Sequence, residues 1–242
     1  MRDTRPAMAS PLMVFDLDGT LVDSAPDLLA TLDAVLPVHG FRPVADPRMR
    51  EGIGHGARHL IVEALKRQGI APDDDALDAL HGDFLAHYEA NICRKSQLYP
   101  GTETMLDRFA AAGWRLAVCT NKKEGLSRQL LEALGVAERF AAICGGDTFA
   151  APKPDPAHLG GTIAASSGAA DRTIMVGDSV TDRDAARAMR VPFVGVSFGY
   201  TTVPMAKLGP DLLIDGFDAL SPEIAEALLA AHADARAAPA DP

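Results

Sequence analysis

Basic residues are in the minority in this chain of 242 residues. Its 23 Lys and Arg stand against 33 Asp and Glu, which leaves a formal charge of −10. A protein that binds a nucleic-acid backbone needs a basic stripe, so this balance argues against a nucleic-acid partner. No apolar run approaches the roughly 20 residues of a membrane-spanning helix, and residues 1–11 lack the apolar centre of an export signal. We therefore expect no nucleic-acid or membrane partner and a cytoplasmic location.

Cysteine is also scarce. Cys93, Cys119 and Cys144 are the only three, and they lack the spacing of metal ligands. Such residues are typical of reduced thiols, which agrees with a cytoplasmic location. Apolar residues, in contrast, make up 48% of the chain and charged residues 23%. This composition supports a sizeable core and excludes wholesale disorder. The length corresponds to one large domain or two unequal ones.

Short apolar runs alternate with helix-like segments from residue 99 onward. This alternation predicts βαβ units and an α/β fold, with a parallel sheet covered by helices on both faces. The apolar run at 11–16 must join that sheet, because a lone strand is not stable. The other expected strands are 114–120, 140–144, 173–176, 192–196 and 211–214, with helices near 103–112, 122–134, 155–167 and 181–190.

Residues 24–95 have a helical pattern that interrupts the α/β alternation. Ser24 is a plausible N-cap for a helix over 24–38. Further helices are expected at 57–65 and after residue 72. The sequence therefore predicts a core domain of residues 11–23 and 96–229 with a helical insertion at 24–95. The Ala-rich tail at 230–242 is expected to be disordered.

Two carboxylates follow the first predicted strand, in Asp16-Leu17-Asp18-Gly19-Thr20. Ligands of an open parallel sheet bind at the carboxyl ends of its strands. Residues two apart face the same side, so Asp16 and Asp18 converge and need a cation or a shared proton. Gly19 lets the chain turn with its N–H groups exposed, which suits an anion. A turn that only caps a helix is the structural alternative.

Two further strand-end segments carry a hydroxyl, an amide and a lysine. Thr120 and Asn121 follow the second predicted strand and can bind phosphate oxygens. The alternative for Thr120 is an ordinary helix N-cap. Lys153 lies between Pro152 and Pro154, which stiffen its loop. A solvated loop lysine is the alternative there.

A second pair of acids, Asp178 and Asp182, follows the predicted strand at 173–176. Carboxylate oxygens clustered without a His or Cys ligand pattern favour Mg²⁺ over Zn²⁺. Helix-capping acids are the structural alternative. The order of acid pair, hydroxyl, lysine and acid pair at successive strand ends favours a common site.

In that order the segments resemble the motifs of the haloacid-dehalogenase-like hydrolases. Residues 16–20 match motif I, Thr120 matches motif II, Lys153 matches motif III, and residues 177–182 match motif IV. The resemblance covers nearly the whole chain. It implies a Rossmann-like core, and it implies that the insertion at 24–95 is a helical cap of the C1 type.

The resemblance also implies the chemistry, which is Mg²⁺-dependent hydrolysis of a phosphomonoester through an aspartyl-phosphate. Asp16 would be the nucleophile and Asp18 the general acid and base. Thr120 and Lys153 would stabilise the transferring phosphoryl oxygens. Mg²⁺ would be held by Asp16, by the backbone carbonyl of Asp18 and by Asp178, with Asp182 as a ligand or an orienting residue, while Gly19, Thr20 and Asn121 would contact the substrate.

Within the family, residues 15–24, 153–156 and 176–182 most resemble phosphoglycolate phosphatases, which implies a small acidic substrate such as 2-phosphoglycolate. The glycine-rich stretch 52–56 precedes the helix at 57–65, whose N-terminus attracts anions. His55 and Arg58 are the nearby side chains able to add positive charge, although the stretch could be only a joint between helices.

Other functions remain open on the sequence. A phosphatase for pyrophosphate, nucleotides or sugar phosphates would share the same motifs, and so would a phosphomutase of the β-phosphoglucomutase type. A non-enzymatic scaffold is disfavoured, because every motif acid is present. The expected partner is a small phosphorylated metabolite, and the chain is expected to be a monomer or a homodimer.

Overall fold

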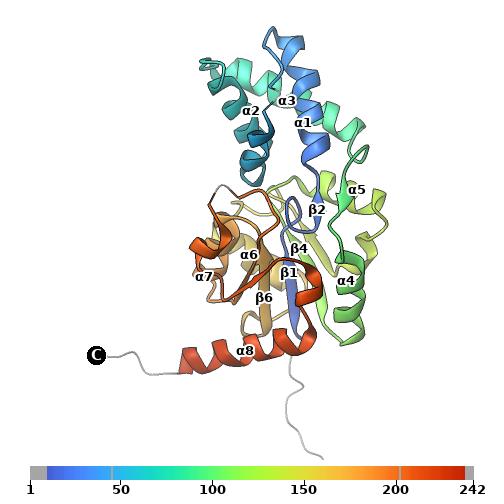
Figure 1. Cartoon of the computed structure of the whole chain (residues 1–242), viewed down its shortest axis with the longest axis vertical. Helices are drawn as coiled ribbons and strands as arrows, with labels where there is room; N and C mark the ends of the chain where they lie inside the picture. Colours follow the sequence, from blue (N-terminus) through green and yellow to red (C-terminus); the bar gives the residue numbers. More distant parts are fainter. Residues whose placement is uncertain (1–9, 45, 202, 238–242) are drawn as a thin grey trace, which may run out of the picture.

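A six-stranded parallel sheet forms the centre of the computed structural model, which describes residues 10–44, 46–201 and 203–237. The register places Phe15 opposite Val118 on one side and Val176 on the other, so three strands end at one edge. The sheet and strand positions expected from the sequence are confirmed (Figure 1). The sheet order is β5 (Ala142–Cys144), β4 (Arg115–Cys119), β1 (Leu12–Phe15), β6 (Thr173–Gly177), β7 (Phe193–Val196) and β8 (Leu212–Ile214).

The strand order reverses beside β1. The chain moves outward from β1 to β4 and β5, then returns to the other side of β1 to form β6, β7 and β8. Parallel sheets with this reversal leave a crevice at the carboxyl ends of the strands next to the switch point. The edge formed by the ends of β1, β4 and β6 is therefore the expected place for a site.

Helices cover both faces of the sheet, because successive side chains of a strand point to opposite faces. Met13 and Phe15 of β1 lie in the same buried cluster as Phe109 and Leu130. Leu12 lies in a second cluster with residues of the opposite helices. The first face carries α4 (Thr102–Ala111), α5 (Glu124–Ala133) and α8 (Pro222–Ala237), and the second carries α6 (Pro156–Ala165) and α7 (Val180–Ala188).

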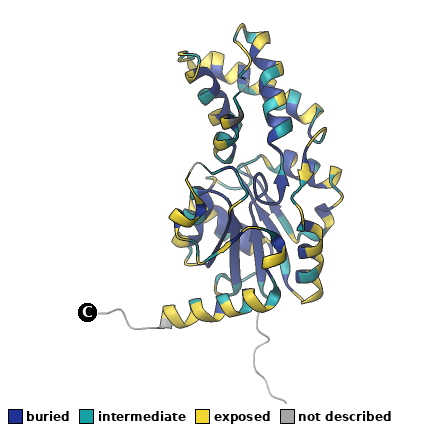
Figure 2. Ribbon diagram, in the orientation of Figure 1, coloured by how far each residue is buried: buried dark blue, intermediate teal, exposed yellow. Residues whose placement is uncertain are grey.

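Three helices stand beyond the carboxyl edge of the sheet, namely α1 (Ala25–Val35), α2 (Ala57–Lys66) and α3 (Asp74–Ala90) (Figure 1). Their buried apolar residues continue the larger cluster of the core, and Figure 2 shows their outward faces exposed. The helix expected over 24–38 ends at Val35, because Pro37 cannot donate a helical hydrogen bond. Two 3₁₀ helices, Leu36–His39 and Pro47–His55, complete this helical cap. No helix in the described ranges combines the length and apolar character needed to cross a bilayer.

The chain enters and leaves the helical cap through a short antiparallel ribbon that the sequence did not predict. Val22–Asp23 (β2) pairs with Gln97–Leu98 (β3). Beside it, the Asp27 carboxylate accepts from the backbone N–H groups of Lys95 and Ser96 at 2.8–3.0 Å. The two connections are thus tied together at one point.

Helix α8 extends further than the composition suggested. The expected disorder from residue 230 is wrong for residues 230–237, which continue α8. Ala is the strongest helix former, and the helix is docked by buried Ala225 and Leu229. The guanidinium of Arg172 also pairs with Glu226 at 3.0 Å. Residues 238–242, the rest of the expected tail, lie outside the described residues, as do residues 1–9 at the other end.

Replacing Leu229 by alanine should destabilise the protein by about 2–5 kcal/mol, because it leaves a cavity under α8. Ile224→Ala on the same helix is the matched control, since Ile224 is 42% exposed. We expect the control to cost less than about 1 kcal/mol. Urea unfolding of the two variants measures the difference, and equal costs would contradict the docking of α8 through Leu229.

Candidate active site

Three carboxylates converge at the carboxyl edge of the sheet. Asp16 follows β1, Asp178 follows β6, and Asp182 lies in the first turn of α7. One oxygen of each lies within 4.8 Å of the others, and all three residues are buried. The strand order explains the convergence, because β1 and β6 are neighbours at the switch point. We call these three residues the carboxylate cluster.

Lys153 is the cation that the structure places against this cluster. Its Nζ lies 3.0 Å from Asp16 Oδ1 and 2.6 Å from Asp182 Oδ1, and its side chain is 1% exposed. The loop lysine is therefore not solvated. Burial opposes its charge, yet Asp16 and Asp182 hold the pKa of Lys153 above its usual value.

One ammonium group does not neutralise three buried carboxylates. Burial, followed by the charge of Asp182, raises the pKa of Asp16 to about 7 in spite of Lys153. Burial and the charge of Asp16 likewise raise the pKa of Asp178 well above its usual value. Within the described ranges the cluster therefore has fewer positive than negative charges around it, and its donors are all carboxylate oxygens. Such a donor set fits a hard divalent cation such as Mg²⁺.

A tight glycine turn holds Asp178 in place. Gly19 has a φ of +84°, and a Cβ there would lie 2.4 Å from Asp178 Oδ2. The other oxygen of this carboxylate accepts from the Thr20 hydroxyl at 3.2 Å, and Oδ2 accepts from the backbone N–H of Tyr200 at 2.7 Å. Glycine is required at this position both for the backbone conformation and for the close approach.

Asp18 has different surroundings from Asp16. Its Oδ2 lies 2.9 Å from Lys122 Nζ, and its other oxygen accepts from the Ser24 hydroxyl. Ser24 is the N-cap residue of α1, as expected, but its side chain makes no capping hydrogen bond to the helix. The Asp18 carboxylate is not part of the carboxylate cluster. The expected convergence of the Asp16 and Asp18 side chains is therefore wrong, and a metal contact through the backbone carbonyl of Asp18 stays a prediction.

Two residues beside the site were missed in the sequence. Lys122 pairs with Asp18 across 104 residues of chain and lies over the Tyr88 ring, 4.7 Å from its centroid. His158 is buried, and its Nδ1 accepts from the backbone N–H of Lys153 at 3.1 Å. Burial and the charge of Lys153 lower the pKa of His158 to about 4, so the ring is a neutral acceptor that fixes the Lys153 loop. A place in a strand-end loop was the only available signal for Lys122.

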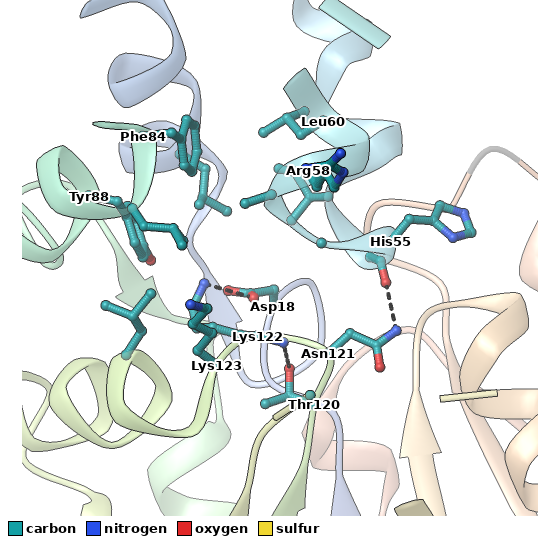
Figure 3. A pocket seen from close by; sticks show the side chains of 18 of the residues that line it. Asp18, His55, Arg58, Leu60, Phe84, Tyr88, Thr120, Asn121, Lys122 and Lys123 are labelled. Atoms are coloured by element: carbon teal, nitrogen blue, oxygen red, sulfur yellow. Dashed lines mark hydrogen bonds and ion pairs between the residues drawn. The ribbon is translucent and has the colours of Figure 1, made fainter. Parts of the chain in front are cut away.

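Thr120 and Asn121 lie at the end of β4, as expected. The Thr120 hydroxyl oxygen accepts from the backbone N–H of Lys122 at 3.3 Å. Helix α5 begins at Glu124, so Thr120 is not its N-cap and that alternative is excluded. Asn121 Nδ2 donates to the carbonyl oxygens of Lys153 at 3.1 Å and of Gly54 in the helical cap at 3.4 Å (Figure 3).

Comparison with known proteins agrees with this arrangement. Residues 13–196 match the family model described as haloacid dehalogenase-like hydrolase. The chain belongs to this family. It is 48% identical over 227 residues to a phosphoglycolate phosphatase of Agrobacterium fabrum, covering 93% of this chain and 97% of that protein. It is 42% identical over 212 residues to a phosphoglycolate phosphatase of Rhodospirillum rubrum, covering 86% and 88%.

A solved structure is similar as well. The crystal structure of a predicted phosphoglycolate phosphatase from Haemophilus somnus superposes with a TM-score of 0.80 at 31% identity, covering 86% of this chain and 95% of that chain. The family and the α/β fold expected from the sequence are both confirmed.

In this haloacid dehalogenase-like hydrolase, a cavity of about 260 Å³ lies between the helical cap and the edge of the sheet (Figure 3). Its floor is polar and consists of core residues, while its ceiling is mostly apolar and comes from the cap. The floor includes Asp16, Asp18, Thr120, Asn121 and Lys122, and the apolar lining includes Leu28, Leu60, Phe84, Leu85 and Leu126.

His55 and Arg58 line this cavity, but their polar groups are directed elsewhere. Arg58 pairs with Asp74 and Asp78 of α3, and its side chain is 43% exposed. The His55 ring packs on the His59 ring with centroids 4.8 Å apart. Figure 3 shows the His55 ring turned away from the centre of the cavity. The buried cation nearest to Asp18 is instead Lys122.

Adding Mg²⁺ to the metal-free hydrolase should raise its Tm, and by more at pH 8 than at pH 5.5. The raised pKa of Asp16 means that this group's stability contribution is present at low pH and is lost as the pH rises through about 7. A bound cation replaces the proton. At 100 times Kd, binding contributes about 2.7 kcal/mol, or about 5–10 °C for a chain of this size. Thermal unfolding after EDTA treatment, with and without Mg²⁺, measures the effect.

Asp178→Asn is the control for this prediction. Removing one charge relieves the repulsion in the carboxylate cluster, so the metal-free Tm at pH 8 should rise while the shift caused by Mg²⁺ shrinks. A Mg²⁺ shift of the native size in this variant would show that the ion binds elsewhere.

Proposed function

We propose that the protein is a Mg²⁺-dependent phosphomonoester hydrolase that transfers the phosphoryl group of its substrate to Asp16 and then to water. The observation that carries the proposal is the difference between two carboxylates of one turn. Both line the cavity, but Asp16 belongs to the carboxylate cluster beside Lys153, whereas Asp18 lies outside that cluster and is paired with Lys122. Two carboxylates in different environments suit the different tasks of nucleophile and proton carrier.

Asp16 is held for attack by its neighbours. Its Oδ1 accepts from the backbone N–H of Leu17 at 2.7 Å and lies 3.0 Å from Lys153 Nζ. These contacts fix the carboxylate and leave Oδ2 to attack phosphorus. A bond forms between Asp16 Oδ2 and phosphorus as the ester P–O bond breaks, which divides one difficult step into two.

Asp18 completes both steps as a proton carrier. It donates a proton to the departing alkoxide, and it later accepts one from the water that attacks the aspartyl-phosphate. The phosphoryl oxygens would be bound by the Lys153 ammonium, the Thr120 hydroxyl and the Asn121 amide. The backbone N–H groups of the turn at residues 19–20 would add further donors.

Asp16, Asp178 and the backbone carbonyl of Asp18 would hold Mg²⁺, which offsets the repulsion between the anionic nucleophile and the phosphate dianion. Asp182 has both oxygens engaged, since Oδ1 lies 2.6 Å from Lys153 Nζ and Oδ2 accepts from the Ser179 backbone N–H at 3.0 Å. Both oxygens of Asp178 also accept hydrogen bonds, but from neutral donors, whereas Asp182 is paired with a buried ammonium. We therefore assign Asp182 a positioning role rather than a direct ligand bond.

The proposed substrate is 2-phosphoglycolate. Support comes from the similarity to proteins named phosphoglycolate phosphatase and from the small cavity with an apolar ceiling. Residues 24–95 would act as a cap domain that closes over the substrate and excludes water. The core domain would consist of residues 11–23 and 96–229, extended by the end of α8.

Asp16→Asn should abolish turnover and phosphoenzyme formation while leaving the fold intact. Its Tm should not fall, because the substitution removes one of three crowded charges. Acid quench of the native enzyme during turnover, followed by mass spectrometry, should locate the phosphoryl group on Asp16. An adduct on another residue, or none, would refute the covalent mechanism.

Asp18→Asn should slow phosphoenzyme formation from 2-phosphoglycolate by about 10²–10⁴-fold, as expected for loss of a general acid. The loss with p-nitrophenyl phosphate should be much smaller, because that leaving group needs little protonation. Single-turnover measurements with both substrates separate this step from hydrolysis of the phosphoenzyme. Equal losses would contradict the proton-transfer role of Asp18.

A further inference from the structure

The hydroxyl group of Tyr88 is buried beside the cavity without a hydrogen-bond partner among the described residues. Tyr88 itself is 1% exposed and comes from α3 of the helical cap. Burying an unpaired hydroxyl costs about 1–3 kcal/mol, and such groups are uncommon in folded proteins. The Lys122 ammonium is the polar neighbour of this hydroxyl, and an anion bound between the two groups would supply the missing partner.

A buried ammonium lies next to this hydroxyl. Lys122 Nζ is 4.7 Å from the centroid of the Tyr88 ring, and the lysine side chain is 6% exposed. Figure 3 shows the Tyr88 hydroxyl directed down from α3 towards the loop that carries Lys122. An ammonium has three N–H donors, and Asp18 accepts from one of them at 2.9 Å. The remaining donors and the tyrosine hydroxyl can serve one anion.

The other charged or polar cap side chains near the cavity are less suited to bind such an anion. Arg58 is paired with Asp74 and Asp78, and the His55 ring packs on His59. Apart from Tyr88, the other cap residues of the lining are His81, whose pKa is lowered by burial, and apolar residues or glycines, which offer few partners for the several hydroxyl groups of a sugar. This lining suits a short leaving group with a single charged end.

We propose that Tyr88 and Lys122 form a subsite for the carboxylate of the leaving group, and that this subsite selects short carboxylated phosphomonoesters over neutral alkyl phosphates. The inference rests on the proposed function, because it places the ester oxygen near Asp18, the neighbour of Lys122. In 2-phosphoglycolate a single carbon separates the ester oxygen from the carboxylate. A carboxylate bound at this subsite therefore lies beside the group that protonates the leaving oxygen.

The subsite joins two parts of the molecule. Tyr88 belongs to the helical cap, whereas Lys122 follows β4 of the core. Binding of a carboxylate by both residues stabilises the arrangement in which the cap covers the core, and water is excluded from the reaction. A substrate without the carboxylate lacks this contact.

The test compares kcat/KM for 2-phosphoglycolate with kcat/KM for ethyl phosphate, which has a methyl group in place of the carboxylate. We define selectivity as the ratio of these two values. Tyr88→Phe removes only the hydroxyl and should reduce selectivity by about 10–100-fold, as expected for a lost hydrogen bond to a charged group. Lys122→Met should reduce it at least as far, and it provides a second measurement should Tyr88→Phe fold poorly.

Tyr99→Phe is the matched control, because Tyr99 is the second tyrosine whose buried hydroxyl lacks a partner in the described part of the chain. Tyr99 does not line the cavity, so the control should retain native selectivity. Arg58→Ala and His55→Ala should retain it as well. A reduced ratio in any of these three variants would contradict the assignment of selectivity to Tyr88 and Lys122.

The possible results distinguish a failure of the subsite from a failure of the proposed function. If the native enzyme does not prefer 2-phosphoglycolate to ethyl phosphate, the proposed substrate is wrong. If the native preference exists but persists in both Tyr88→Phe and Lys122→Met, the proposed function stands and the subsite is refuted. A selective loss in these two variants supports the subsite.

Discussion

Repulsion among three buried carboxylates is the main constraint on the structure at the carboxyl edge of the sheet. Desolvation makes each charge costly, and a single lysine cannot neutralise Asp16, Asp178 and Asp182 together. Many surrounding features hold this unfavourable arrangement in place, including the glycine turn against Asp178 and the neutral His158 ring behind the Lys153 loop. The same deficit of positive charge, with carboxylate oxygens as the donors, is what makes the cluster suitable for a divalent cation.

Two acids that are only two residues apart have different environments. The turn after β1 places the Asp16 carboxylate in the carboxylate cluster and the Asp18 carboxylate outside it, against Lys122 and Ser24. Alternation along an extended segment predicts that both acids lie on the same side, and it does not predict this separation. The contacts of Asp18 with Ser24 and Lys122 account for the separation of the two carboxylates.

The sheet and the core of the site could be predicted because their signals are local. Apolar runs mark β1, β4 and β6, and parallel strands bring the residues that follow them to one edge. Tyr88 and His158 carry no such signal, and Lys122 has only its place after β4; the contacts of all three are with partners that the local sequence does not reveal. The prediction of disorder for residues 230–237 is wrong for another reason. Composition suggests fraying, but the docking of Leu229 on the core is a tertiary contact that extends α8.

The ribbon of β2 and β3 bears on how such a protein can diversify. Because the chain leaves and re-enters the core at paired strands, the ends of the inserted segment are adjacent and its closure adds little entropy cost. An insert of different length or shape can be accommodated between β2 and β3 without displacing any strand of the six-stranded sheet. The carboxylate cluster and Lys153 lie on the core side of the ribbon, and most of the apolar lining of the cavity comes from the inserted helices. Substitution, or even exchange, of the insert could therefore change substrate preference while leaving the reaction itself untouched.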